Sequence, residues 1–104
     1  MTIKYLQKTE GMPKIEQLEI ELKNKLMTDA AVESDKENDP EWYEEYSKTQ
    51  MQDFKEIKSI KKVKAIFYEV ETDNGKRYYQ DSHEEWQGIW EFCQVSESHF
   101  NNIL

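Results

Sequence analysis

The chain has 104 residues, enough for one domain, and its 12% of aromatic residues excludes a disordered tail. Its formal net charge of −8 argues against direct binding to nucleic acid or to an anionic membrane, because both need clustered Lys and Arg. Cys93 is the single cysteine and no stretch approaches the roughly 20 apolar residues that span a bilayer, so we expect a cytoplasmic protein without a disulfide.

The first predicted elements are an extended segment and a helix. Residues 2–8 alternate weakly between apolar and polar side chains, which predicts a short edge strand or an ordered arm. Pro13 stands where the first turn of a helix tolerates a missing N–H. Leucines at helical spacing follow. Strand-like alternation also exists there, but the length and the Glu/Lys/Leu composition favour a helix over residues 13–28.

A second helix is predicted after an acidic loop. Residues 29–39 show no periodicity and predict this loop. Asp39 and Pro40 together form a start signal, with the aspartate as N-cap and the proline at the first helical position. We expect the helix to run to about residue 57. Its predicted inner face consists of Tyr43, Tyr46, Phe54 and Ile57.

A β-hairpin is the next predicted element. Residues 63–72 are rich in β-branched and aromatic side chains, and a type I′ turn at Asn74 and Gly75 would follow them. This turn would pair Asp73 with Lys76 and Val70 with Tyr79. The predicted apolar core face consists of Ile66, Tyr68, Val70 and Tyr79, and the opposite face of Ala65, Phe67, Glu69, Glu71, Tyr78 and Gln80.

The C-terminal part predicts a helix that begins at Ser82, where Glu85 could complete a capping box. The side chains at helical spacing are Trp86, Ile89, Trp90 and Cys93. Residues 96–104 predict a last short turn that docks Phe100, Ile103 and Leu104. The predicted class is therefore α+β in a single small domain. It has two N-terminal helices, an antiparallel β-hairpin, which is three-stranded if residues 2–8 join it, and a C-terminal helix.

The acidic run over residues 29–45 is the most informative feature for function. It places eight carboxylates against one lysine, Lys36. Grouped like charges repel one another, so we expect either a solvated surface or a surface used to contact a basic partner. Trp42, beside the run, and Tyr78, on the outer hairpin face, are candidate aromatic anchors. The predicted partner-binding residues are Glu37, Asp39, Glu41, Trp42, Glu44, Glu45 and Tyr78.

Motifs for catalysis, metals and cofactors are missing from the sequence. His83, Cys93 and His99 lack the paired short spacing that is typical of zinc sites. The three glycines are scattered and form no phosphate-binding loop. We therefore expect a protein that is not an enzyme and that binds no metal and no cofactor.

These features favour a small acidic inhibitor that blocks a basic, nucleic-acid-handling protein, with carboxylates that imitate DNA phosphates. In size and charge the chain is similar to acidic proteins that phages, plasmids and toxin systems encode for this purpose. The alternative is an adaptor subunit of a larger assembly, docking through the hairpin edge or the C-terminal aromatic helix. We expect a monomer or a weak dimer, because charge repulsion opposes self-association.

Overall fold

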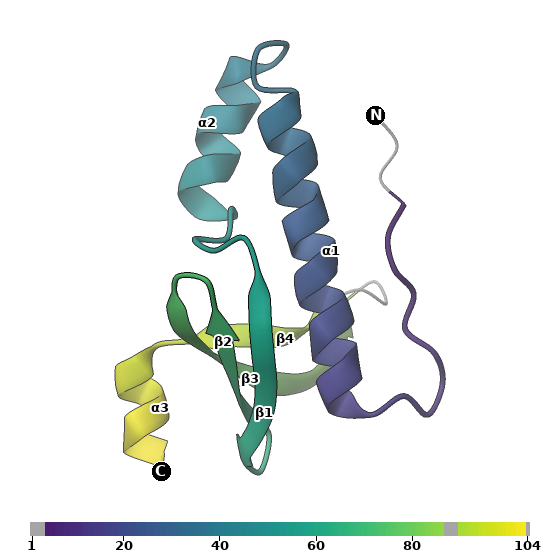
Figure 1. Ribbon diagram of the computed structural model, residues 1–104, viewed down its shortest axis with the longest axis vertical. Helices are drawn as coiled ribbons and strands as arrows, with labels where there is room; N and C mark the ends of the chain where they lie inside the picture. Colours follow the sequence, from purple (N-terminus) through teal and green to yellow (C-terminus); the bar gives the residue numbers. More distant parts are fainter. Residues whose placement is uncertain (1–3, 87–89, 104) are drawn as a thin grey trace.

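The computed structural model describes residues 4–86 and 90–103, which form an antiparallel sheet with helices on both faces (Figure 1). The elements in chain order are α1 Lys14–Ser34, α2 Pro40–Thr49, β1 Ile57–Lys64, β2 Phe67–Thr72, β3 Gly75–Trp86, β4 Trp90–Val95 and α3 Glu97–Ile103. The strand order is β1-β2-β3-β4, so each strand pairs with its neighbour in the chain. The predicted α+β class is confirmed, with a four-stranded sheet in place of the hairpin.

Helix α1 is longer than predicted. It ends at Ser34, so the prediction of an acidic loop over residues 29–39 is wrong for its first part. Val32 is 1% exposed and Asp29 is 3% exposed, because α2 packs beside this end of α1. This burial favours continuation of the helix, and the connection to α2 shortens to residues 35–39.

Helix α2 begins as predicted but ends early. The Asp39 carboxylate accepts a hydrogen bond from the Trp42 backbone N–H at 3.2 Å, which confirms the N-cap. The helix stops at Thr49 because residues 50–56 turn toward β1, and Phe54 from this loop enters the core at 2% exposure. The residues of the predicted inner face therefore lie on three elements. Tyr43 and Tyr46 are in α2, Phe54 is in the loop, and Ile57 is the first residue of β1.

The predicted hairpin corresponds to β2 and β3, with a different register. Its turn lies at Asp73 and Asn74, so Thr72 pairs with Gly75 and Tyr68 with Tyr79, and the predicted pairs are wrong. Gly75 adopts a positive φ of 93°, which glycine takes without strain. The partner of Val70 changes from the predicted Tyr79 to Arg77, a shift of two positions, so the predicted faces of the strands are unchanged.

The predicted strand over residues 63–72 is divided by a turn at Ala65 and Ile66 between β1 and β2. Ala65 takes a positive φ of 48°, the left-handed conformation that lets the chain reverse here. Strand β1 is consequently an edge strand that begins at Ile57 and carries the lysines of residues 58–64. The N-terminal segment does not join the sheet, so the predicted third strand from residues 2–8 is not found in the described part of the chain.

The predicted helix from Ser82 is wrong. Strand β3 continues to Trp86 and β4 begins at Trp90, with Asp81 opposite Phe92. Phe92 is 4% exposed in the core whereas Cys93 is exposed, which is the two-residue alternation of a strand. Gly88 and Ile89 lie outside the described residues, as do the side chains of Trp86 and Trp90. The C-terminal aromatic helix, one of the two docking elements named for the adaptor alternative, is therefore replaced by two strands.

The sheet is covered on both faces. The α1 face holds the main core, which consists of Leu18, Leu22, Phe54, Tyr68, Val70, Tyr79 and Phe92. On the other face Phe100 of α3 stacks on Tyr78, with ring centroids 4.2 Å apart, and meets Phe67 edge-on at 6.4 Å. The predicted docking of Phe100 is confirmed at 4% exposure, while Leu104 and the Ile103 side chain lie outside the described residues.

Candidate interaction surface

The end of the α1–α2 pair that points away from the sheet carries most of the acidic run (Figure 1). We call residues 33–45 the acidic tip. Its carboxylates are Glu33, Asp35, Glu37, Asp39, Glu41, Glu44 and Glu45, and Lys36 is its one basic residue. All of these side chains are exposed except Asp35, which is half-buried. Folding therefore collects mutually repelling charges at one end of the molecule.

Five of these seven carboxylates form no ion pair with a residue that the structure describes, and Glu33 pairs with Lys55 at 3.3 Å. The carboxylates of Glu37, Glu41 and Glu45 make no hydrogen bond or ion pair with any residue that the structure describes. Glu44 pairs with Lys48 at 2.9 Å, one helical turn away, and both side chains are about 70% exposed. Such exposed pairs contribute at most about 1 kcal/mol and are easily exchanged for a partner's cation. The tip is consequently available for contact with a basic surface.

Lys36 does not offset the tip's charge by pairing with its neighbours. Its ammonium lies 4.9 Å from the centroid of the Tyr43 ring, within the range of a cation–π contact. Among the described residues no carboxylate lies within ion-pair distance of this ammonium. The single lysine of the tip is thus placed over an aromatic ring, and the acidic groups are left facing solvent.

Trp42 is the exposed aromatic side chain of the tip. It is 47% exposed, and its ring lies 5.9 Å from that of Tyr46, tilted by 48°. Glu41 precedes it and Glu45 follows within one helical turn, so the indole lies among carboxylates. A half-exposed tryptophan on a helix is the type of residue that most often anchors a protein interface.

A buried hydrogen-bond cluster fixes α2 against α1 beneath Trp42. The Tyr46 hydroxyl donates to Asp29 Oδ1 at 2.6 Å, and the Gln52 backbone N–H donates to Asp29 Oδ2 at 3.0 Å. Burial raises the pKa of Asp29, and the two hydrogen bonds oppose that rise. Burial, and then the neighbouring Asp29, raise the pKa of Tyr46 as well. Asp29 belongs to the acidic run in the sequence, but its role in the structure is internal.

Tyr78 does not belong to the same surface. It is half-buried on β3, under Phe100 of α3, whereas the other predicted binding residues lie on the acidic tip. Helix α3 and the tip lie at different ends of the molecule (Figure 1). The structure therefore brings together Glu37, Asp39, Glu41, Trp42, Glu44 and Glu45, and separates Tyr78 from them.

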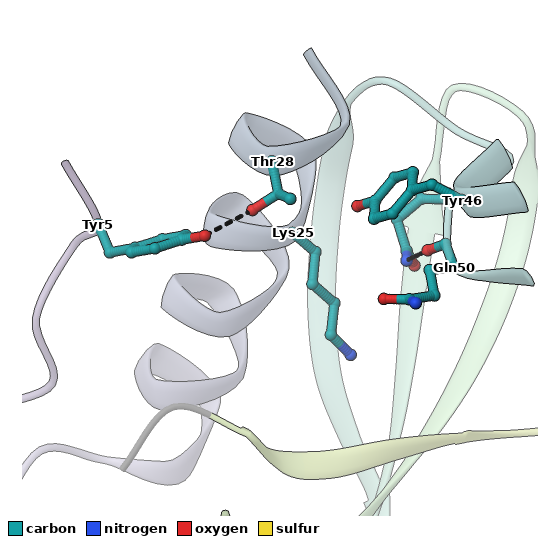
Figure 2. Close-up of a pocket in the computed structure, with 6 residues that line it drawn as sticks. Tyr5, Lys25, Thr28, Tyr46 and Gln50 are labelled. Carbon is teal, nitrogen blue, oxygen red and sulfur yellow. Dashed lines mark hydrogen bonds between the residues drawn. The ribbon is translucent and has the colours of Figure 1, made fainter. Parts of the chain in front are cut away.

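A cavity of about 320 Å³ lies between the N-terminal segment, α1 and α2. Its lining consists of Tyr5, Lys25, Thr28, Tyr46, Gln50 and Gln52. Figure 2 shows the Tyr5 hydroxyl directed at Thr28, with Tyr46 and Gln50 on the opposite side and Lys25 extending between them. Hydroxyl, amide and ammonium groups share this lining with a comparable apolar surface, so the cavity suits a ligand that is partly polar and partly apolar.

A second group of charged residues, absent from the predicted site, lies buried between the N-terminal segment, α1 and β4. Glu21 is 0% exposed, and its carboxylate accepts the backbone N–H groups of Glu91 at 2.5 Å and Phe92 at 3.3 Å. The Lys8 ammonium lies 3.4 Å from the same carboxylate. Lys14 donates to Glu91 at 2.6 Å, and this hydrogen bond raises the pKa of Lys14. These charges are paired within the fold.

The described residues contain no group of three or more potential metal ligands. In the same part of the chain no helix is long and apolar enough to cross a membrane. Comparison of the chain with protein-family models, curated proteins and solved structures found no match. The geometry of the surface is therefore the basis for a functional proposal.

Proposed function

We propose that the protein is a small, non-catalytic binding protein that uses the acidic tip to cover a basic surface of a partner protein. The partner we favour is a nucleic-acid-handling enzyme, because its phosphate-binding groove offers clustered Lys and Arg. The observation that carries the proposal is the exposed Trp42 among the unpaired carboxylates of Glu37, Glu41 and Glu45. An inhibitory or immunity-type role follows if the covered surface is the one that binds substrate.

The two parts of this surface would act differently. The carboxylates attract a basic partner over distances of about the Debye length, 8–10 Å in ordinary salt, and so raise the rate of association. Trp42 would bury its ring against the partner and slow dissociation, as interface tryptophans do. Glu41 and Glu45 lie one helical turn apart, about 5–6 Å between Cβ atoms, so a groove that binds successive phosphates would meet successive carboxylates.

The test is affinity capture from a lysate of the source cell, with nuclease added, followed by binding measurements with the purified partner. The natural chain is compared with a triple variant that carries Glu41→Lys, Glu44→Lys and Glu45→Lys. We expect capture of a basic protein, and loss of about two orders of magnitude in affinity for the triple variant. Affinity for the natural chain should also fall steeply toward about 0.5 M salt, where the Debye length is only about 4 Å.

A matched control separates the tip from the total charge. Glu16, Glu56 and Glu97 are exposed carboxylates outside the tip and outside the N-terminal segment, and replacing all three by lysine changes the net charge by the same amount. We expect the affinity of this control variant for the partner to stay within about threefold of that of the natural chain. The remaining difference would come from weaker long-range electrostatic attraction, which lowers the association rate. Equal losses in both triple variants, or undiminished binding by the tip variant, would contradict the proposal, as would a partner whose surface is acidic.

A further inference from the structure

The N-terminal segment is bound to α1 in the way that a protein binds a peptide. Residues 4–12, which we call the arm, run beside α1 without belonging to a helix or strand (Figure 1). In the described part of the chain, the arm makes one backbone–backbone hydrogen bond, and it is internal to the arm: the Met12 N–H donates to the Thr9 carbonyl at 3.2 Å. The arm is therefore held by side chains. Gly11, with a φ of 78° that glycine takes without strain, lies in the turn at the end of the arm that leads to α1.

Asn24 of α1 binds the backbone of the arm. Its Oδ1 accepts the Leu6 N–H at 2.8 Å, and its Nδ2 donates to the Leu6 carbonyl at 3.1 Å. Asn24 is 3% exposed, whereas the Leu6 side chain is 45% exposed and makes no part of this contact. A buried amide that satisfies both backbone groups of one residue recognises an extended chain without regard to the side chain at that position.

The neighbouring positions are recognised through their side chains. Thr28 is hydrogen-bonded to the Tyr5 hydroxyl at 3.0 Å, and Glu21 pairs with the Lys8 ammonium. Lys8 also lies 3.7 Å from the Glu91 carboxylate. Glu21, Asn24 and Thr28 are spaced by three and four residues, so they share one face of α1. We call these three residues the arm groove.

The arm leaves space at both ends of the arm groove. The cavity of about 320 Å³ in Figure 2 begins at Tyr5, and a second one of about 300 Å³ begins at Lys8 and extends toward Lys14 and Gln17. Both hollows are open to solvent, and their volumes lie at the lower end of the range of sites that take a ligand. A longer or bulkier segment than the arm would fill them, whereas the arm of a second copy would leave the same space.

Charge determines the kind of segment that fits. The arm has a net charge of +1, from Lys4, Lys8 and Glu10. Because the whole chain has a net charge of −8, residues 13–104 have a net charge of −9. Glu21 and Glu91 both lie at the Lys8 position. The groove therefore favours an extended segment with a lysine two residues after the position that Asn24 binds.

We propose that the arm groove is a binding site for an extended, lysine-bearing segment of a partner protein, and that the arm occupies it as an intramolecular competitor. The inference takes from the proposed function only the basic character of the partner, because the groove and the acidic tip are separate surfaces. A tethered arm has an effective concentration of about millimolar, so a partner segment gains access when it binds better than the arm or when the arm is released.

The experiment uses a labelled peptide with the sequence of residues 4–10, Lys-Tyr-Leu-Gln-Lys-Thr-Glu, and the full-length chain. The variant Leu6→Pro removes the N–H that Asn24 accepts and leaves the groove itself unaltered. We expect the peptide to bind this variant saturably and at least about tenfold more tightly than it binds the natural chain. NMR of the arm resonances verifies release of the arm, and a second variant, Tyr5→Ala, weakens the arm at a different contact and should act in the same direction.

Matched controls identify the groove. Adding Asn24→Asp to Leu6→Pro keeps the shape of the side chain but removes the amide donor, and should lower peptide affinity at least about tenfold. A peptide with Glu in place of Lys8 should bind as poorly. Adding Glu41→Lys, Glu44→Lys and Glu45→Lys to Leu6→Pro should leave peptide affinity within about threefold of that of Leu6→Pro alone, so failure of one proposal leaves the other standing. Two results would overturn the inference. One is that the peptide does not bind saturably to a folded Leu6→Pro chain whose arm is released. The other is that Asn24→Asp does not change the affinity for the peptide.

Discussion

The carboxylates at the two ends of α1 differ in what surrounds them. Near its start, Glu21 is fully buried and contacts Lys8, Lys25 and two backbone N–H groups. Beyond its end, Glu41 and Glu45 of the acidic tip are exposed and contact no described partner. A buried carboxylate without partners would be very unfavourable, while an exposed one is stable in water. The buried Glu21 therefore stabilises the fold, whereas Glu41 and Glu45 are left without a described partner.

The largest effect on stability is expected at Glu21. Glu21→Ala leaves the Glu91 and Phe92 N–H groups and the Lys8 ammonium without their buried acceptor, which should lower the free energy of unfolding by about 3–5 kcal/mol. Urea denaturation measures this loss. Glu41→Ala is the control and should stay within about 0.5 kcal/mol of the natural chain. Similar losses at both positions would remove the distinction between the two ends.

The next effect is expected where the tip joins the core. Tyr46→Phe removes the hydroxyl that donates to Asp29 and should destabilise the fold by about 1–3 kcal/mol. Burial already raises the pKa of Asp29 above its ordinary value of 3.8, and loss of this hydrogen bond raises it further. When the pKa of a carboxyl group is higher in the folded than in the unfolded chain, protonation at low pH stabilises the folded chain. This stabilisation is lost as pH rises through the pKa of the folded chain. The destabilisation should therefore grow as pH rises through the raised pKa of Asp29 in the folded chain, and a loss that does not depend on pH would contradict this explanation.

A smaller effect with the opposite pH dependence is expected at the sheet. Arg77 Nη2 donates to Asp53 Oδ2 at 2.6 Å and Arg77 Nε donates to Oδ1 at 3.0 Å, and this pairing lowers the pKa of Asp53. A lowered pKa contributes stability above the unfolded value of 3.8 that is lost as pH falls through the folded pKa. Because Asp53 is 61% exposed, Asp53→Asn should cost no more than about 1 kcal/mol at pH 7, and less below pH 4. Thermal unfolding at the two pH values tests the sign.

The smallest effect on stability is expected at the tip itself. Replacing Glu37, Glu41 and Glu45 by glutamine removes unpaired, mutually repelling charges and should change the free energy of unfolding by less than about 0.5 kcal/mol, toward greater stability. The same substitutions should reduce binding to the basic partner, so stability and binding move in opposite directions. A loss of stability of more than about 1 kcal/mol would indicate that these carboxylates support the fold.

Local signals predict the α2 start, the β2–β3 faces and the docking of Phe100, because an N-cap, an alternating strand and an isolated aromatic residue each act over few positions. The predicted C-terminal helix is wrong because Trp86, Trp90 and Cys93 have helical spacing, whereas pairing with β3 places the chain in a strand. Pairing partners are distant in sequence, so local patterns do not contain this information.

The acidic tip is predictable from its charge, but two features of the candidate sites depend on tertiary structure. Asp29 belongs to the acidic run by sequence, and its burial follows only from the packing of α2 on a longer α1. The arm groove is absent from the sequence-based predictions. A signal for it exists in Asn24 and Thr28, which are weak helix formers inside a predicted helix, one turn apart and on the same face as Glu21.

The proposal stands or falls on a binding titration of the captured partner against three chains at ordinary salt. They are the natural chain, the Lys variant at Glu41, Glu44 and Glu45, and the Lys variant at Glu16, Glu56 and Glu97. Both variants carry the same net charge. We expect a loss of about 100-fold for the tip variant and an effect of less than about threefold for the control, with both chains folded and their free energies of unfolding within about 2 kcal/mol of the natural chain. Equal affinities for the two variants would contradict the account, because binding would then depend on total charge or on another surface.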